Sequence, residues 1–484
     1  MKRKIALALT MAMLGTCLAG CGQADADTNA STEAKDTTAA AETTEAEKEW
    51  YGTEDGKTIT LHFWGGVQPE YGYDDLCANF NEEYKDKGLQ VEYVRYVNDD
   101  NGNLQLETYL MGGGDVDLFI GYGGRTKMDK RVDSNLLLDM SGMLNDIGFN
   151  LDDELGVANM AEYHYDDGSV YGFPTKYENS RWILINEDMF KEAGLDIPYD
   201  GWTYSEFLAD AEKLTHGEGQ DKVYGVCWAR KQSGKSILYA LDGVLGANQI
   251  YKNEEGTEVN FDNDVYRDGL NLVKETLDKG YAIPIEDEFS EDISVANTFL
   301  QGKCAIMLGV AQMRLCMDQE NYPHDFTTAL VPAPVPDDEK YNTEFYRKQI
   351  GTTGAGDLLS ISANTKYPEA SFEFAMWYLK GGMSPLVKGG RIPLWNGVDK
   401  SEVLSVLKEK AQGSIDMDSM ENYLSLDTTQ GVAAIKGHAS SEISSAWFEE
   451  FDAMCYGKQS VDQTVQNMEK RGNELIQTEL SSQK

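Results

Sequence analysis

Aromatic and polar side chains follow two predicted strands in the first quarter of the chain. Trp64 ends an alternating run at residues 58–64, and Tyr122 and Arg125 come just after an apolar run at residues 116–120. Sugar rings pack their C–H faces on Trp or Tyr, while their hydroxyls hydrogen-bond to charged and amide side chains. Open α/β sheets bind ligands at the carboxyl ends of their strands. These three residues are therefore candidates for sugar binding, although each alone is more often a core or surface residue.

Motifs for catalysis, cofactors or metals are weak. The segment SGKS at residues 233–236 imitates the end of a phosphate-binding loop, but Ala229 stands where that motif needs its first glycine. The five histidines are far apart, and the 82 acidic residues make any chosen carboxylate pair uninformative. The five cysteines after residue 21 contain no C-x-x-C pair and fit no zinc spacing, so we expect buried thiols. We expect no catalytic residue, no metal and no cofactor.

The N-terminus has the pattern of an export signal. Lys2, Arg3 and Lys4 precede an apolar run at residues 5–14 that is too short to span a membrane as a stable helix. The following LAGC at residues 18–21 resembles a bacterial lipobox, which implies a signal peptide at 1–20 and lipidation of Cys21. An ordinary secretory signal with an incidental cysteine is the alternative. Residues 21–56, rich in Ala, Thr, Asp and Glu, predict the lipidated cysteine and a disordered acidic tether.

Charge and length narrow the class of protein further. The chain has 484 residues, which suggests two or three domain-sized units, and a formal charge of −40 that becomes −43 without the three basic residues of the signal. Such a surface repels nucleic acid and anionic lipid headgroups, so we exclude nucleic-acid binding. The acidity is typical of the solubility of an exported protein. No later apolar run reaches the length of a membrane span.

Strand and helix patterns alternate along the rest of the chain. Predicted strands lie at 58–64, 89–94, 116–120, 182–185, 224–228, 305–308, 329–334 and 357–361. Helical spacing occurs at 73–85, 189–193, 265–279, 368–379 and 461–480, and Thr203 is a predicted N-cap of a helix that runs to Leu214. Strands separated by helices predict an α/β architecture with parallel strands.

Four segments, in this order, carry a resemblance to a known family. They are GGDVDLF at 113–119, YGFP at 171–174 with LINEDMF at 184–190 and Trp202, FLQGKCAIM at 299–307, and LSIS at 359–362 with PEA at 368–370. In this order they resemble the family 1 extracellular solute-binding proteins, the maltose-binding-like receptors of ABC importers. The resemblance covers nearly all of residues 57–480, with a usual proline absent from the first segment and Ile185 in place of a usual tyrosine.

The resemblance implies a two-lobed α/β fold of the periplasmic-binding-protein type, class II. The lobes would be discontinuous and joined by a hinge, with the ligand cleft between them. It implies an N-terminal lobe at 57–170 plus 357–392 and a C-terminal lobe at 171–356 plus 393–484. It also implies a monomer that performs no chemistry, anchored to the outer face of the cell membrane through Cys21 and working with ABC permease subunits.

The resemblance also suggests ligand-binding residues. Glu178 has the spacing after Pro174 of a glutamate that hydrogen-bonds sugar hydroxyls in the maltose-binding branch, and Tyr122 and Arg125 match an aromatic residue and an arginine of the cleft. Gln312 stands near the position of a family tryptophan that is absent here. Further candidates are Trp228 and Trp395.

Three hypotheses remain open from the sequence. The first is a receptor for a mono- or oligosaccharide, and the second a receptor for a polyol, sugar phosphate or peptide. A phosphorylated or uronic ligand would require more cations in the cleft than Arg125 alone. The third is a surface glycoside hydrolase or lyase, which the order of the family segments disfavours.

Overall fold

The computed structural model describes residues 50–66, 72–97, 100–178, 181–233, 250–291, 293–347, 357–425 and 437–482. The predicted signal peptide, Cys21 and the predicted tether up to residue 49 lie outside the described residues. Residues 50–56, predicted as the end of the tether, contact the folded body. The backbone N–H of Tyr51 donates to the carbonyl of Lys87 at 2.8 Å, and the Tyr51 ring lies 6.0 Å from that of Tyr84.

The first sheet has five strands in the order β2-β1-β3-β10-β4. Its strands are β1 (Ile59–Gly65), β2 (Leu89–Arg95), β3 (Leu118–Gly121), β4 (Phe173–Pro174) and β10 (Leu358–Ile361). The strands β1, β2 and β3 are parallel, as the alternation of strands and helices predicts. Strand β10 returns from far along the chain and pairs antiparallel with β3 and β4, so the sheet is mixed.

The second sheet has four strands in the order β7-β8-β6-β9. These are β6 (Trp182–Asn186), β7 (Tyr224–Cys227), β8 (Cys304–Leu308) and β9 (Thr328–Pro332). All five residues of β6 are buried, because the strand runs antiparallel between β8 and β9 and both of its faces are covered. Asn186 then caps the next helix by accepting from the N–H of Met189 at 3.0 Å.

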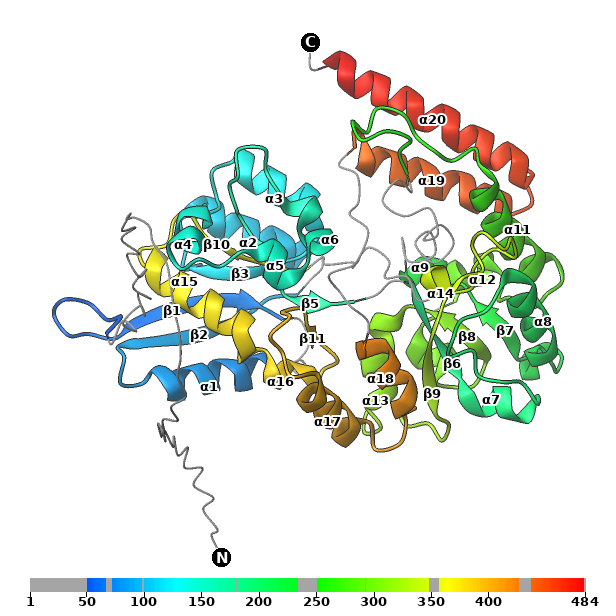
Figure 1. The fold of residues 1–484 in the computed structure, drawn as a ribbon, viewed down its shortest axis with the longest axis horizontal. Coiled ribbons are helices and arrows are strands. Elements are labelled where there is room, and N and C mark those ends of the chain that lie inside the picture. Colours follow the sequence, from blue (N-terminus) through cyan, green and yellow to red (C-terminus); the bar gives the residue numbers. More distant parts are fainter. Residues whose placement is uncertain are drawn as a thin grey trace, which may run out of the picture. The chain divides into compact units, whose positions relative to one another are not determined.

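A two-stranded ladder lies where the chain passes between the sheets. It pairs β5 (Lys176–Tyr177) antiparallel with β11 (Ile392–Pro393). Strand β5 follows β4 of the first sheet and precedes β6 of the second, and Figure 1 shows β5 and β11 between the elements of the two sheets. The N–H of Leu394 donates to the carbonyl of Thr175 at 2.9 Å and extends the pairing. Two crossings of the chain are thus bonded to each other.

Helices cover both sheets (Figure 1). They are α1 (Tyr73–Tyr84), α2 (Asp100–Gly112), α3 (Gly124–Asp133), α4 (Ser141–Asp146), α5 (Leu151–Leu155), α6 (Val157–Met160), α7 (Glu187–Glu192), α8 (Tyr204–Leu214), α9 (Arg230–Ser233), α11 (Asp264–Asp278), α12 (Ile285–Ser290), α13 (Met313–Met317), α14 (Glu344–Arg347), α15 (Pro368–Trp377), α16 (Ser384–Val387), α17 (Lys400–Ala411), α18 (Met417–Ser425), α19 (Ser440–Cys455) and α20 (Val461–Ser482). Short turns of other helix types are η2 (Ala161–Tyr163), η3 (Gly219–Asp221), η5 (Val295–Phe299), η6 (Val310–Gln312) and η7 (Tyr378–Gly382).

The packing of these helices follows from their apolar faces. Helices α1 and α15 contact the first sheet, α8 contacts β7 and β8 of the second, and α19 packs along α20. The predicted N-cap Thr203 is confirmed, since its hydroxyl accepts from the N–H of Glu206 and the Glu206 carboxylate accepts from the N–H of Thr203. Within the described residues, none of the helices is long and apolar enough to cross a membrane.

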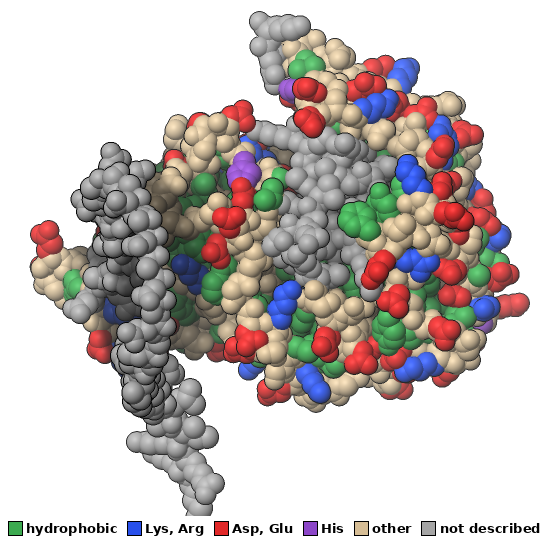
Figure 2. Space-filling view, viewed as in Figure 1, with side chains coloured by type: hydrophobic (Ala, Val, Ile, Leu, Met, Phe, Trp, Pro, Cys, Tyr) green, Lys and Arg blue, Asp and Glu red, His purple; other side chains and the backbone are tan. Residues whose placement is uncertain are grey.

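Side-chain burial separates an apolar core from an acidic surface. The largest fully buried side chains include Trp182, Trp228 and Trp447. Cys77, Cys227, Cys304 and Cys316 are buried free thiols, as predicted, and Cys455 is partly buried. Figure 2 shows acidic side chains scattered over the visible face rather than gathered in one patch.

Close packing between β7 and α8 yields a test of the second sheet. A Cβ at Gly225 would lie 2.2 Å from the carbonyl oxygen of Ala211 in α8. We expect Gly225→Ala to lower the free energy of unfolding by about 1–3 kcal/mol, because the helix must move off the strand. Urea unfolding measures this change. The control is Gly142→Ala in α4, where an added Cβ meets no heavy atom within 4 Å; equal stability of the two variants would contradict the packing.

Candidate ligand-binding site

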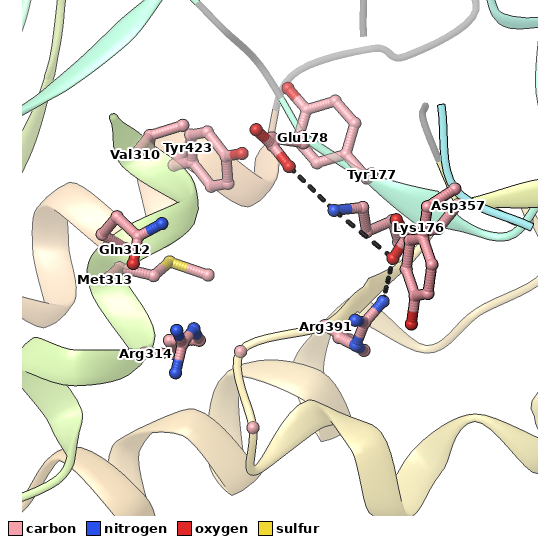
Figure 3. Close-up of a pocket in the computed structure, with 13 residues that line it drawn as sticks. Lys176, Tyr177, Glu178, Val310, Gln312, Met313, Arg314, Asp357, Arg391 and Tyr423 are labelled. Atoms are coloured by element: carbon pink, nitrogen blue, oxygen red, sulfur yellow. Dashed lines mark hydrogen bonds and ion pairs between the residues drawn. The ribbon is translucent and has the colours of Figure 1, made fainter. Parts of the chain in front are cut away.

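A polar cavity of about 210 Å³ lies where the crossings meet segments from both sheets. Four segments that are distant in sequence contribute to its wall (Figure 3). They are strand β5 with the residue after it, the turn η6 with the start of α13, the residue before β10, and the segment before β11. The residues that line it are Tyr122, Lys176, Tyr177, Glu178, Val310, Gln312, Met313, Arg314, Asp357, Gly389, Gly390, Arg391 and Tyr423.

Four charged side chains form a continuous chain of ion pairs along one wall. The Lys176 ammonium lies 3.0 Å from Glu178 Oε2 and 3.6 Å from Asp357 Oδ2. Arg391 donates from Nη1 to the same oxygen of Asp357. The Asp357 and Arg391 side chains are 9 % and 10 % exposed, and those of Lys176 and Glu178 19 % and 20 %. Figure 3 shows this chain, which we call the ion-pair quartet, running from Glu178 to Arg391.

The quartet keeps its buried members ionised. Burial is the largest effect on the Asp357 carboxyl and would raise its pKa, but the charges of Lys176 and Arg391 together hold that pKa below its usual value. Burial likewise opposes the charge of Lys176, yet Asp357 and Glu178 raise the pKa of its ammonium. The pKa of Arg391 is raised in the same way, with Tyr73 and Asp357 outweighing burial. The wall is therefore a row of alternating fixed charges.

Tyrosines surround the buried end of the quartet. The Arg391 guanidinium lies 5.8 Å from the centroid of the Tyr73 ring. The Tyr122 hydroxyl is buried and accepts or donates no hydrogen bond among the described residues. Burial raises the pKa of Tyr122, so this phenol is neutral and able both to donate and to accept. A buried hydroxyl with no partner gains free energy when a ligand supplies one.

Three of the sequence-predicted site residues line this cavity: Tyr122, Glu178 and Gln312. Glu178 follows β5, and extended backbone projects its side chain to the same side as Lys176, two residues earlier. Gln312 ends η6 and lies on the wall opposite the quartet, next to Met313 and Arg314 (Figure 3). The segments that carry these three residues are distant in sequence and meet only through the fold.

Two predicted tryptophans lie in the core instead. Trp64 is 3 % exposed, and its indole N–H donates to the carbonyl of Asp115 at 2.8 Å while its ring packs on Tyr109 at 4.8 Å. Trp228 is 1 % exposed and donates to the hydroxyl of Thr276 at 2.9 Å. Neither residue lines the cavity, because each indole satisfies its polar N–H inside its own sheet's packing.

Arg125 and Trp395 also lie away from the cavity. The Arg125 guanidinium donates to the carbonyls of Glu162 and His164 at 2.7 and 3.0 Å and to Asp129 at 2.6 Å, so it fastens α3 to the segment after α6. Trp395 lines two neighbouring cavities with Pro393 and Val398, and its indole N–H donates to Glu154 at 2.7 Å.

Sequence reasoning did not select Lys176, Asp357, Arg391 or Arg314. Lys176 could have been predicted, since it lies two positions before Glu178 in an extended segment and its side chain therefore points to the same side. Asp357 begins a predicted strand, and acids at strand starts are too common to single out. Arg314 and Arg391 carried no signal, because only the folded chain brings them to one cavity.

The protein has two helix-covered sheets joined by the paired crossing strands β5 and β11, and a polar cavity lies at these crossings. This arrangement defines a two-lobed binding protein. The model of bacterial extracellular solute-binding proteins matches residues 65–380, more than half of the chain, and the chain belongs to this family. The predicted family and two-lobed fold are confirmed. Proteins of this family bind solutes outside the cytoplasm.

Solved structures share this fold at low sequence identity. A sugar transporter from Rhizobium etli in an open conformation is 17 % identical with a TM-score of 0.64, and the match covers 87 % of this chain and 99 % of that one. An ABC substrate-binding protein from Listeria monocytogenes in complex with cycloalternan is 17 % identical, with a TM-score of 0.63 and coverage of 86 % and 98 %. A cyclic α-maltosyl-1,6-maltose-binding protein from Arthrobacter globiformis is 16 % identical with a TM-score of 0.63, and the match covers 87 % of this chain and 100 % of that one.

The buried carboxylate of Asp357 yields a stability prediction. Asp357→Asn leaves two enclosed cations without their shared partner, so we expect the free energy of unfolding at pH 7 to fall by about 3–5 kcal/mol. Urea unfolding at several pH values measures it. Because the pKa of Asp357 is lowered in the folded state, the carboxylate stabilises fully above the unfolded pKa of about 3.9, and this contribution is lost as the pH falls through the folded pKa.

The difference in the free energy of unfolding between the wild-type protein and Asp357→Asn should therefore become smaller below about pH 4. Asp86→Asn, at an exposed position, is the control for the same chemical change and should be nearly neutral. A small effect of Asp357→Asn at pH 7 would show that the quartet does not hold the crossings together.

Proposed function

We propose that the protein is a lipid-anchored receptor that captures a carbohydrate in the described cavity and passes it to the permease of an ABC transporter. The observation that carries the proposal is the cavity itself, in which Glu178, Gln312 and the Tyr122 hydroxyl are arranged around one space. These groups supply both donors and acceptors, as the hydroxyls of a sugar require. The related proteins named for a sugar, cycloalternan and cyclic maltosyl-maltose support the same ligand class.

Aromatic rings complete the recognition of a sugar. Tyr177 and Tyr423 line the cavity, with ring centroids 5.2 Å apart and an angle of 43° between the rings. Tyr423 is packed edge-on against Trp182 at 5.2 Å, so its position is set by the core of the second sheet. A pyranose ring that packs on these aromatics would direct its hydroxyls toward Glu178 and Gln312.

The mechanism we propose is closure of two lobes around the ligand. The pairing of β4 with β10 supports assigning Phe173–Pro174 to the N-terminal lobe, and the ladder of β5 and β11 supports placing the hinge at residues 175–178 and 391–395. A ligand that contacts Gln312 from one lobe and Glu178 at the hinge binds the closed state better than the open one. The population then shifts by as much as that difference in affinity permits.

The anchor is the second part of the proposal. Cys21 and the lipobox-like residues 18–20 lie outside the described residues, and the proposal for them rests on the sequence pattern. Between Cys21 and the first described residue, Trp50, lie 28 residues of tether sequence with no aromatic residue. This length would let the body capture solute near the membrane and reach the permease.

Glu178 provides the test of the cavity. We expect Glu178→Gln to weaken ligand binding at least tenfold, because a hydrogen bond to a charged group contributes about 1.5–3 kcal/mol. The unliganded melting temperature should change little, since Lys176 keeps its contact with Asp357. A thermal-shift screen with mono- and oligosaccharides followed by calorimetric titration measures both quantities.

The matched control for this test is Glu421→Gln, which makes the same change at an exposed position of α18. Wild-type affinity in Glu178→Gln would place the binding site elsewhere. Turnover of any glycan in the screen would contradict the proposed receptor and indicate a glycoside hydrolase or lyase. Thermal stabilisation by a polyol or a peptide alone would contradict the proposed carbohydrate ligand.

Cys21 provides the test of the anchor. We expect Cys21→Ser to abolish incorporation of labelled palmitate and to move the protein from the membrane fraction to the medium. Cys17→Ser, four residues upstream, is the control and should leave labelling and location unchanged. Equal labelling of the Cys21 variant and the wild-type protein would exclude this cysteine as the lipidated residue.

A further inference from the structure

Glu288 carries a fully buried carboxyl group that the proposed binding mechanism does not use. Its side chain belongs to the short helix α12 and is 0 % exposed. Its helix neighbours Glu286 and Phe289 are exposed, so α12 lies at the surface of the protein. The helix packs against α9, which follows strand β7 of the second sheet (Figure 1). Glu288 therefore points inward from a surface helix.

Backbone groups hold the Glu288 carboxyl. Its Oε2 accepts from the N–H of Lys231 at 3.4 Å, and the N–H groups of Ala229 and Arg230 also donate to the carboxyl. Ala229 has a φ of 50°, in the left-handed region that residues other than glycine seldom adopt. Such a conformation turns consecutive N–H groups toward one acceptor. The segment 229–231 is thus shaped around the end of the Glu288 side chain.

Side chains do little to neutralise a charge on this carboxyl. Among the described residues, no lysine or arginine forms an ion pair with Glu288. The nearby Arg230 instead donates twice to Asp452, at 2.8 and 2.9 Å, and its guanidinium lies 4.0 Å from the centroid of the Phe448 ring. On the other side, the thiol of Cys227 donates to Oε1 of Glu288 at 3.9 Å. An ionised Glu288 is therefore costly where it lies.

This environment moves the titration of Glu288 to neutral pH. Burial raises the pKa of its carboxyl to about 7, and the three backbone N–H groups and Arg230 oppose the shift only in part. The neighbouring thiols stay neutral there, because a hydrogen bond to Cys304 and burial raise the pKa of Cys227, and burial raises that of Cys455. The charged and titratable groups around Glu288 are Arg230 and Lys231 of α9, Cys227 of β7, Asp452 and Cys455 of α19, and Glu286 of α12.

The sign of the pH effect follows from the two pKa values. A glutamate in water has a pKa of about 4.3, well below that of the buried Glu288. Between these values the buried carboxyl binds a proton that the exposed one does not bind, so protonation favours the closed arrangement. As the pH rises through 7, the buried group ionises and an opening that brings it to water becomes easier.

The end of β7 connects this carboxyl to the ligand-binding cavity. Cys227, which contacts Glu288, is the last residue of β7 and pairs with Met307 of β8. Strand β8 then leads through Gly309 into η6, which carries Gln312 of the cavity wall. A movement at the end of β7 therefore has only one neighbouring strand to cross before it reaches the cavity.

We propose that Glu288 is a pH switch: loss of its proton near neutral pH releases α12 from the segment 229–231 and loosens the cavity wall at Gln312. The regulation of ligand capture rests on the proposed function, whereas the opening at α12 does not. The switch requires no ligand to operate, so it is tested on the unliganded protein.

Hydrogen exchange of the full chain, corrected for the intrinsic exchange rate at each pH, provides the test. With pKa values of about 7 closed and about 4.3 open, the opening equilibrium should rise about tenfold between pH 6 and pH 8. We expect the protection of residues 229–231 to fall by that factor, and the protection of residues 310–313 to fall with it.

Variants of α12 show whether Glu288 is the group that titrates. Glu288→Gln has nearly the same size but cannot ionise, so its corrected protection should change less than about twofold over this pH range. Glu286→Gln makes the same change on the exposed side of the helix and should keep the wild-type response. Glu288→Met repeats the test without a polar group, and melting temperatures check that each variant folds.

A direct measurement on the wild-type protein completes the experiment. Infrared spectra should show the loss of one protonated carboxyl group between pH 6 and pH 8. Its absence, or an equal response of wild-type protein and Glu288→Gln in hydrogen exchange, would overturn the switch. A response at residues 229–231 without one at 310–313 would overturn the regulation of the cavity. None of these results bears on carbohydrate capture, which Glu178→Gln tests separately.

Discussion

The arrangement of the cavity depends on one buried carboxylate, that of Asp357. The described part of the chain passes between the two sheets through β5 and through the segment that enters β11, and Asp357 stands directly before β10 of the first sheet. Lys176 lies on the first of these crossings and Arg391 at the start of the last, and both contact the same oxygen of Asp357. Burying a carboxylate next to a single cation seldom repays its loss of hydration. Two cations on separate crossings, one of which also contacts Glu178, make the burial favourable and fix the crossings against each other.

This constraint explains why the ligand-binding groups lie at the crossings rather than at the strand ends of one sheet. A side chain at a strand end is held by its own sheet and is easily absorbed into that sheet's core, as Trp64 and Trp228 are. The quartet, by contrast, cannot be buried in the core of one sheet, because its members come from segments that connect the two sheets or lie beside these connections. The same residues therefore hold the crossings together and present charge to the cavity.

The sequence reveals what depends on local periodicity. The strands of five residues or more and the long helices α11 and α20 follow from local sequence patterns, as does the N-cap at Thr203. The order of four family segments indicates the two-lobed fold. The two-residue strands β4, β5 and β11 have no period to detect, and the antiparallel return of β10 depends on a partner hundreds of residues away. Glu178 was suggested by the family resemblance, through its spacing from Pro174, whereas Arg391 and Asp357 are paired only by the fold.

The distribution of aromatic and charged residues then determines what the cavity can select. Of the four predicted aromatic candidates, only Tyr122 lines it, and the other rings on its wall are Tyr177 and Tyr423, so no tryptophan face is available among the lining residues. Selection must rest more on hydrogen bonding and charge than on extended stacking. The quartet satisfies its own charges and presents alternating donors and acceptors to hydroxyls.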